Sequence, residues 1–206
     1  MAAKAEDPVV EVEDAAAWHA WLSAHHAQSR GVLLRIPKGR APGALTYAEA
    51  VDVALAWGWI DGQKRALDGS AWLQRFTPRT AKSGWSKINR GRAEALVSAG
   101  KMQPSGLAEV ERARKDGRWD RAYDGARSAA VPEDLTAALA RAPKARAFFE
   151  SLDSANRYAI LYRLQTAKTD RTRAERLTKF VAMCAKGETI HPRRAAKRPG
   201  TRSSPA

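Results

Sequence analysis

The first half of the chain mixes two hydrophobic periodicities. Short strands are predicted at residues 9–13, where apolar and polar positions alternate, and at the apolar segment 32–36. Apolar positions three to four residues apart, typical of an amphipathic helix, follow Asp14 and again follow Thr46. Thr46 and Glu49 also have the spacing of a capping box, in which each side chain satisfies a free backbone amide. Strands and helices are therefore expected to alternate here.

A β-hairpin is predicted after the second helix. The segment WGWIDGQ, residues 57–63, is interpreted as a buried strand or tight turn that leads into it. Asp68-Gly69 is a strong signal for a two-residue turn. Counting outward from that turn places Arg65 opposite Trp72, which predicts a cation–π contact across the two strands.

From Ser86 onward the periodicity is helical. Gly91 lies inside the first of these helices, where it costs roughly 1 kcal/mol relative to alanine. We therefore expect another backbone to approach closely at Gly91. Further helices are predicted to begin near Pro104, Pro132, Pro143, Asp153 and Asp170.

These elements predict an α+β fold with two domains. Residues 1–125 are expected to form an α+β domain with a small sheet that includes the hairpin. Residues 131–190 are expected to form an all-helical domain of four helices. Residues 193–206 carry five basic residues, no acidic residue and two prolines, so a disordered basic tail is expected there.

The formal charge of +14 is high for 206 residues. Such a charge raises encounter rates with nucleic acid, acidic proteins or anionic lipid, but it does not specify which of them binds. A genome that favours arginine and alanine would produce the same composition. The basic excess is therefore either functional or compositional.

Cysteine usage and hydropathy predict a soluble, cytoplasmic protein. Cys184 is the single cysteine, which excludes an intrachain disulfide and suits a reducing compartment. The first residues lack a signal-peptide core, and no run approaches the roughly 20 apolar residues of a membrane helix. Nucleotide-binding glycine motifs and metal-ligand spacings are also missing. No cofactor and no metal are predicted.

A candidate anion site lies in residues 75–92, which hold six basic residues and no acid. The helix that starts at 86–89 would add free amides and the positive end of its dipole. The residues predicted to bind the anion are Arg75, Arg79, Lys82, Trp85, Ser86, Lys87, Asn89 and Arg90. Trp59 and Trp72 would form an aromatic wall. The alternative is a solvated basic loop beside tryptophans that belong to the core.

Asp61 is a weak candidate for a catalytic acid or base, because large apolar neighbours can raise the pKa of a carboxyl group. Two structural roles compete with this one. Asp61 could order the turn that follows it, or it could pair with Arg75 or Arg79 and orient that side chain.

Three segments, WGWIDGQ (57–63), LQRFTPR (73–79) and WSKINR (85–90), resemble the YdeI/OmpD-associated, or bacteriocin-protection, family. Residues 148–192 are similar to the terminal helical region of that family, so the likeness runs from about Val9 to Pro192. The resemblance implies a setting of stress or antimicrobial-peptide resistance and an association with a porin. It brings no catalytic residues.

Three functions remain open from the sequence. The chain could be a module that binds phosphate or nucleic acid, with the basic tail adding affinity. It could instead be an enzyme acting on a small anionic metabolite, with Asp61 as acid or base. It could also be an interaction protein whose helices, residues 131–190, contact a protein partner.

Overall fold

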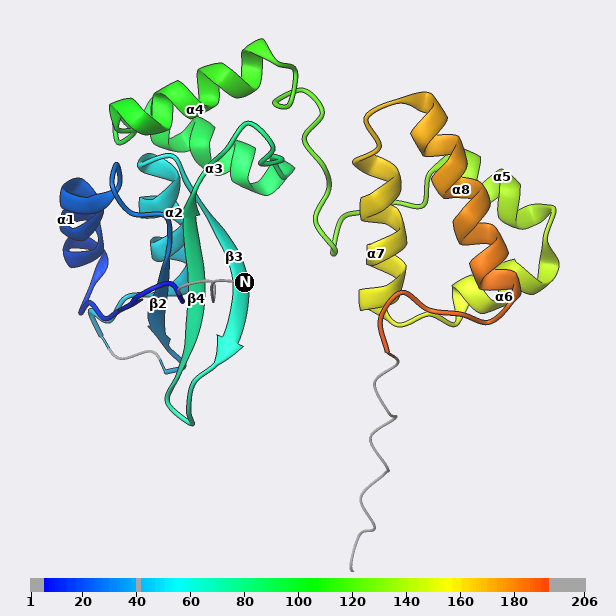
Figure 1. Ribbon diagram of the computed structural model, residues 1–206, viewed down its shortest axis with the longest axis horizontal. Helices are drawn as coiled ribbons and strands as arrows, with labels where there is room; N and C mark the ends of the chain where they lie inside the picture. Colours follow the sequence, from blue (N-terminus) through cyan, green and yellow to red (C-terminus); the bar gives the residue numbers. More distant parts are fainter. Residues whose placement is uncertain (1–5, 40–41, 193–206) are drawn as a thin grey trace, which may run out of the picture. The chain divides into compact units, whose positions relative to one another are not determined.

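The computed structural model describes residues 6–39 and 42–192 (Figure 1). The chain divides into two compact units between Tyr123 and Asp124. The predicted disordered tail, residues 193–206, lies outside the described residues.

The N-terminal unit has an α+β fold, as predicted. Its four strands form one sheet in the order β1-β2-β4-β3, with β1 parallel to β2 and the other pairs antiparallel. The strands are β1 (Val9–Val10), β2 (Val32–Pro37), β3 (Trp59–Ala66) and β4 (Ala71–Pro78). The helices are α1 (Ala15–His25), α2 (Tyr47–Ala56), α3 (Lys87–Ser98) and α4 (Pro104–Lys115).

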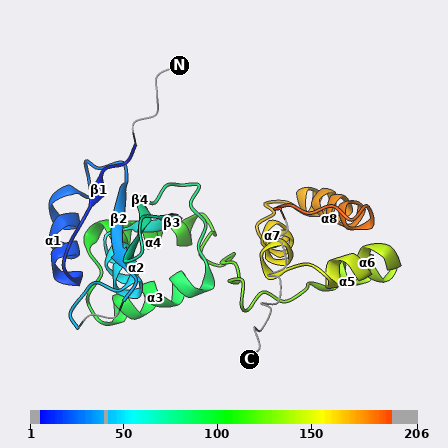
Figure 2. The ribbon, with the colours of Figure 1, turned by 90° about the horizontal axis from the view of Figure 1, so that it is seen from below.

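The helices of this unit lie on one face of the sheet (Figures 1 and 2). Trp18 on α1 is fully buried, and its ring centroid lies 5.7 Å from that of Phe76 on β4. The predicted capping box at the start of α2 is present, and Asp14 caps α1 by accepting from the Ala17 amide. In the part of the chain that the structure describes, no helix covers the opposite face, here called the open face.

The hairpin register differs by one residue from the predicted one. Ala66 pairs with Trp72 and Arg65 pairs with Leu73, with an irregularity between Asp61 and Lys64. The turn is also stabilised by the Asp68 carboxylate, which accepts from the backbone amides after Gly69. A shift of one residue moves a side chain to the other face. The predicted contact between Arg65 and Trp72 is therefore wrong.

Close backbone approach occurs at Gly106 and not at Gly91. A Cβ atom added at Gly106, on α4, would lie 2.1 Å from the carbonyl oxygen of Ala56 on α2. A Cβ atom at Gly91, on α3, would meet nothing within 4 Å among the described residues. The sequence shows which helices contain glycine, but the crossing of α2 and α4 decides where glycine is required.

The C-terminal unit consists of four helices, α5 (Glu133–Ala140), α6 (Pro143–Glu150), α7 (Ser154–Gln165) and α8 (Asp170–Ala185). The sequence predicts all four. Its core includes Leu135, Phe149, Ile160, Leu164, Phe180 and Cys184. Arg173 on α8 donates to both carboxylate oxygens of Asp134 on α5, at 2.7 and 2.9 Å. This two-point contact joins the first helix of the unit to the last.

Replacing Gly106 by alanine is expected to destabilise the N-terminal unit by about 1–3 kcal/mol or more, because the backbone of Ala56 cannot rotate away. Denaturant unfolding followed by tryptophan fluorescence measures the change. Gly91→Ala is the matched control, and it should stabilise α3 by up to about 1 kcal/mol. Equal effects of the two substitutions would show that α2 and α4 do not cross so closely.

Candidate functional site

The residues predicted to bind an anion do not converge on one site. Arg75 is on β4 and points to the open face, because it pairs with Leu33 while its neighbour Gln74 is buried on the helix side. Arg79 and the residues after it belong to the loop before α3 or to α3 itself. Within that second group, Lys82 and Lys87 are exposed.

Arg79 and Trp85 form a closed stack. Trp85 is 2% exposed, and the guanidinium carbon of Arg79 lies 3.6 Å from its ring centroid. Nη1 of Arg79 donates to the Gly84 carbonyl at 3.1 Å. Its Nε and Nη2 atoms are buried and have no hydrogen-bond partner among the described residues. Burial lowers the pKa of Arg79 to about 10.

The start of α3 is occupied by the protein itself. The Ser86 hydroxyl accepts from the Asn89 amide at 3.1 Å, and the Lys87 amide donates to the Tyr123 carbonyl at 2.8 Å. Arg90 lies near the Trp119 carbonyl and near Glu94 on its own helix. Trp85 is in the core and these two amides are already bonded, so neither is open to an external anion here. Anion binding by the exposed residues of this segment stays a prediction.

The predicted aromatic wall is also divided. Trp59 is 1% exposed and packs edge-on against Trp21 in the core, so it offers no ring face to a ligand. Trp72 is partly exposed, but Lys64 Nζ lies 4.3 Å from its ring centroid. Lys64 thus occupies the place that the predicted register gave to Arg65.

Asp61 connects β3 to α2. Its carboxylate accepts a hydrogen bond from the Tyr47 hydroxyl at 2.6 Å. Burial and this hydrogen bond raise the pKa of Tyr47. Among the described residues, Asp61 forms no ion pair with Arg75 or Arg79. The contact with Tyr47 gives Asp61 a structural role, and a role as acid or base stays a prediction.

Three arginines from three neighbouring strands share the open face. Arg75 lies on β4, Arg65 on β3 and Arg35 on β2, and the register places all three on the same side of the sheet. Their side chains remain 32–53% exposed. We call Arg35, Arg65 and Arg75 the arginine row.

A groove of about 640 Å³ runs along part of this face. Arg65, Arg75 and Lys64 line it together with Gln63, and Leu33 contributes apolar surface. Guanidinium groups beside a shallow hollow suit an extended anion better than a compact buried one, because they are spread over three strands and remain partly exposed.

Each arginine of the row is paired with an acid from the segment around β1. Arg75 Nε lies 2.5 Å from Asp7, Arg65 Nη1 lies 3.4 Å from Glu6, and Arg35 Nε lies 3.8 Å from Glu11. Glu6 and Asp7 also line the groove. Carboxylates of the chain itself thus occupy the positions where an external anion would bind.

Sequence reasoning missed Arg35, Arg65 and the three acids. The arginines are far apart in the chain, and only the sheet register brings them onto one face. The detectable signal was the group of acids on both sides of β1, which includes Glu6, Asp7 and Glu11. Its partner could not be identified without the strand order.

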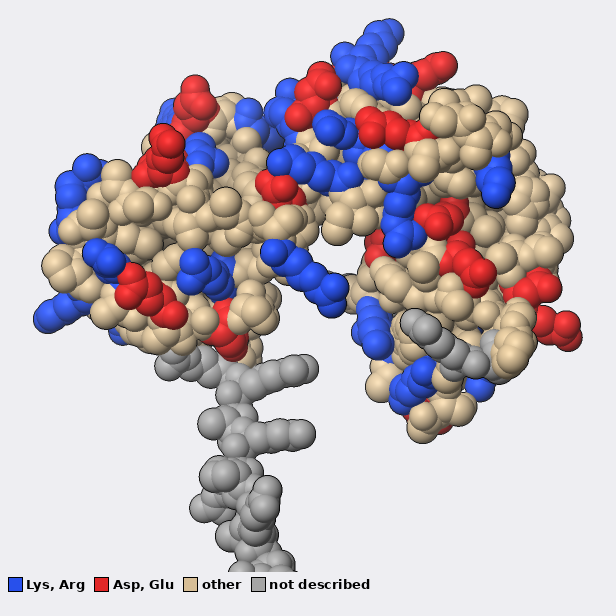
Figure 3. Space-filling model, turned by 180° about the vertical axis from the view of Figure 1, so that it is seen from behind, with Lys and Arg blue, Asp and Glu red and all other residues tan. Residues whose placement is uncertain are grey.

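The helix-covered side of the N-terminal unit has a mixed charge distribution. For this unit taken by itself, Figure 3 shows Lys and Arg side chains interspersed with Asp and Glu. The last turn of α4 is an exception, because it carries Arg112, Arg114 and Lys115. The helix-covered side therefore offers mostly balanced charge.

The chain is a two-unit protein, with an α+β unit followed by a four-helix unit. Each unit matches a different family model. Residues 128–187 match the family model described as Bacteriocin-protection, YdeI or OmpD-Associated. This match covers the helical unit, and it confirms there the resemblance that the sequence indicated. Residues 10–109 match a separate model, a domain of unknown function (DUF8412), and this range holds the three N-terminal motifs. No curated protein and no solved structure matches the chain.

Membrane spans and metal clusters are both missing from residues 6–39 and 42–192. None of the helices in these ranges is both long and apolar enough to cross a membrane. The same residues contain no group of three or more His, Cys, Asp or Glu side chains that could hold a metal ion.

Arg79→Met is expected to leave the free energy of unfolding unchanged or to raise it by about 1 kcal/mol. Methionine keeps apolar contact with Trp85 and removes a buried charge that has two unbonded nitrogens. Arg79→Ala should instead cost about 2 kcal/mol or more, because it also removes the stack. Chemical unfolding measures both, and a large loss with methionine would show that the guanidinium itself stabilises the fold.

Proposed function

We propose that the N-terminal unit binds an extended polyanion on its open face, with a single-stranded phosphodiester chain as the best-fitting class. The arginine row supplies the contacts to phosphate, and Gln63 lines the groove beside it. The protein would work in a setting of stress or antimicrobial-peptide resistance, in keeping with the bacteriocin protection that the family description names.

One observation carries this proposal. Three arginines that are separated in sequence lie on one sheet face, and each one is within 4 Å of a carboxylate. Glu6, Asp7 and Glu11 pair with the arginine row in the way that a short external polyanion would. A surface that accepts this segment has the charge pattern to accept another chain of negative charges.

The energetics allow the exchange of one anion for the other. Exposed ion pairs contribute about 0–1 kcal/mol each, so the contacts of Arg65 with Glu6 and of Arg35 with Glu11 are weak. The pair of Arg75 with Asp7 is partly buried and shorter, and it is the one that an external anion has to displace at a cost. A phosphodiester chain gains the entropy of released counterions in addition to its direct contacts. Displacement of the acids then needs no unfolding of the sheet.

The double substitution Arg65→Gln with Arg75→Gln is expected to weaken binding of a fluorescein-labelled single-stranded oligonucleotide at least tenfold. The slope of log affinity against log salt should fall by about 1.4, because each lost phosphate contact accounts for about 0.7. Fluorescence anisotropy at several salt concentrations measures both quantities.

The matched control removes two positive charges elsewhere in the same unit, through Lys101→Ala with Lys115→Ala. Both lysines are exposed, and neither is on the open face. An equal loss of affinity in the control would mean that only the net charge of the protein matters. Such a result would contradict a defined site.

Neutralising the competing acids should have the opposite effect. Glu6→Gln with Asp7→Asn is expected to raise affinity for the same oligonucleotide several-fold, because the phosphates no longer displace two carboxylates. Glu111→Gln with Asp120→Asn changes net charge equally at exposed positions and is the control. If both double variants gain the same affinity, the N-terminal acids do not compete for the row.

A further inference from the structure

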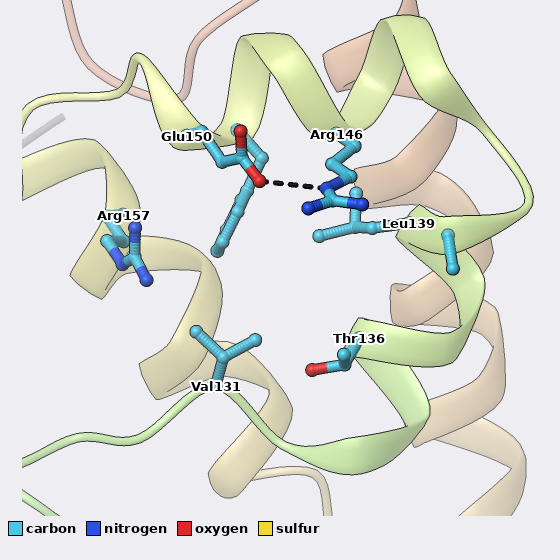
Figure 4. A pocket seen from close by; sticks show the side chains of 8 residues that line it. Val131, Thr136, Leu139, Arg146, Glu150 and Arg157 are labelled. Carbon is cyan, nitrogen blue, oxygen red and sulfur yellow. Dashed lines mark hydrogen bonds and ion pairs between the residues drawn. The ribbon is translucent and has the colours of Figure 1, made fainter.

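The C-terminal unit contains a pocket of about 270 Å³ that is independent of the arginine row. Residues from α5, α6 and α7 line it, together with Val131 from the segment before α5 (Figure 4). Leu139 and Phe149 provide apolar walls, and both are buried elements of the core of this unit. The polar groups of the pocket come from Thr136 and from charged side chains on α6 and α7.

The size of the pocket limits what it can hold. Pockets for drug-sized ligands begin at roughly 300 Å³, so this one fits a single compact apolar group. Val131, Leu139 and Phe149 would surround such a group with hydrocarbon. The burial of an apolar group is the main source of affinity that such walls offer.

The charges around the pocket leave one cation unpaired. Arg146 Nε donates to the Glu150 carboxylate at 2.9 Å, and Figure 4 shows this pair at one side of the pocket. Arg157 lies across from Arg146, and its guanidinium carbon is 4.9 Å from the ring centroid of Phe149. Among the described residues no carboxylate pairs with Arg157.

We propose that this pocket binds a monocarboxylate that carries a compact apolar group. The apolar group would sit between Leu139 and Phe149, and the carboxylate would accept from the guanidinium of Arg157. A planar guanidinium matches the two oxygens of a carboxylate. Glu150 beside the pocket disfavours a second negative charge on the ligand, which selects against phosphate.

Two sources offer this chemistry: a free small acid, or the last residue of a polypeptide with an apolar side chain. The polypeptide carries further residues on its α-nitrogen, whereas the free acid does not. Both share the carboxylate and the apolar group, so probes of each kind distinguish them.

The experiment titrates the full-length chain, labelled with ¹⁵N, with N-acetyl-leucine and with N-acetyl-leucine amide. The acid is expected to shift the amide resonances of residues that line the pocket, and the uncharged amide should bind at least tenfold more weakly. A peptide that ends in leucine is compared with the same peptide carrying a C-terminal amide. Tighter binding of the free-acid peptide than of N-acetyl-leucine identifies a chain terminus as the ligand.

Arg157→Gln should abolish the preference for the acid over the amide. Arg171→Gln removes the same charge from an exposed pair with Glu175 on α8 and should leave the preference unchanged. Ala140→Trp fills the pocket without altering its charge, and it should reduce binding of both probes. This third variant keeps the test decisive if Arg157→Gln fails to fold.

Several outcomes would overturn the proposal. They are equal affinity for acid and amide, an unchanged preference in Arg157→Gln, or the absence of any shift in the pocket with all four probes. None of these outcomes bears on the arginine row, which lies in the other unit.

Discussion

The register of the β3–β4 hairpin is the constraint on which the charge distribution of the N-terminal unit depends. Arg65 pairs with Leu73, which places it on the same face as Arg75. A shift of one residue would exchange Arg65 with Lys64 and break up the arginine row. The same register brings Lys64 over the ring of Trp72. The register shift between Asp61 and Lys64 therefore decides that Arg65 lies on the open face and Lys64 on the other.

Positive charge is handled in two ways in this unit. Arg79 is buried. Its guanidinium group stacks on Trp85 and donates a hydrogen bond to the Gly84 carbonyl. The arginine row remains partly exposed and is paired with acids near β1, two of them through long contacts with exposed carboxylates. An exposed arginine can exchange one anionic partner for another at low cost, whereas buried Arg79 cannot. The arginine row can therefore serve as a binding surface, and Arg79 serves as a structural contact.

Local signals in the sequence were sufficient for the elements but not for the site. The capping box of Thr46 and Glu49, the Asp68-Gly69 turn and the prolines before the late helices identify most of the architecture. The burial of Trp85, which removes it from the predicted anion site, depends on packing against Trp119 from a distant segment. Only the strand order and register show that Arg35 and Arg65 lie on the same face as Arg75. Gly106 shows the same limit, because its role comes from the crossing of two helices.

The most direct test of an anion-binding open face is an NMR titration that follows the Nε–Hε groups of arginine as a single-stranded oligonucleotide is added. A ligand on the arginine row predicts that the resonances of Arg35, Arg65 and Arg75 move together with the backbone amides of residues 6–11. The Nε–Hε resonance of buried Arg79 should stay in place. Movement confined to the end of α4, with the arginine row unchanged, would contradict binding on the open face.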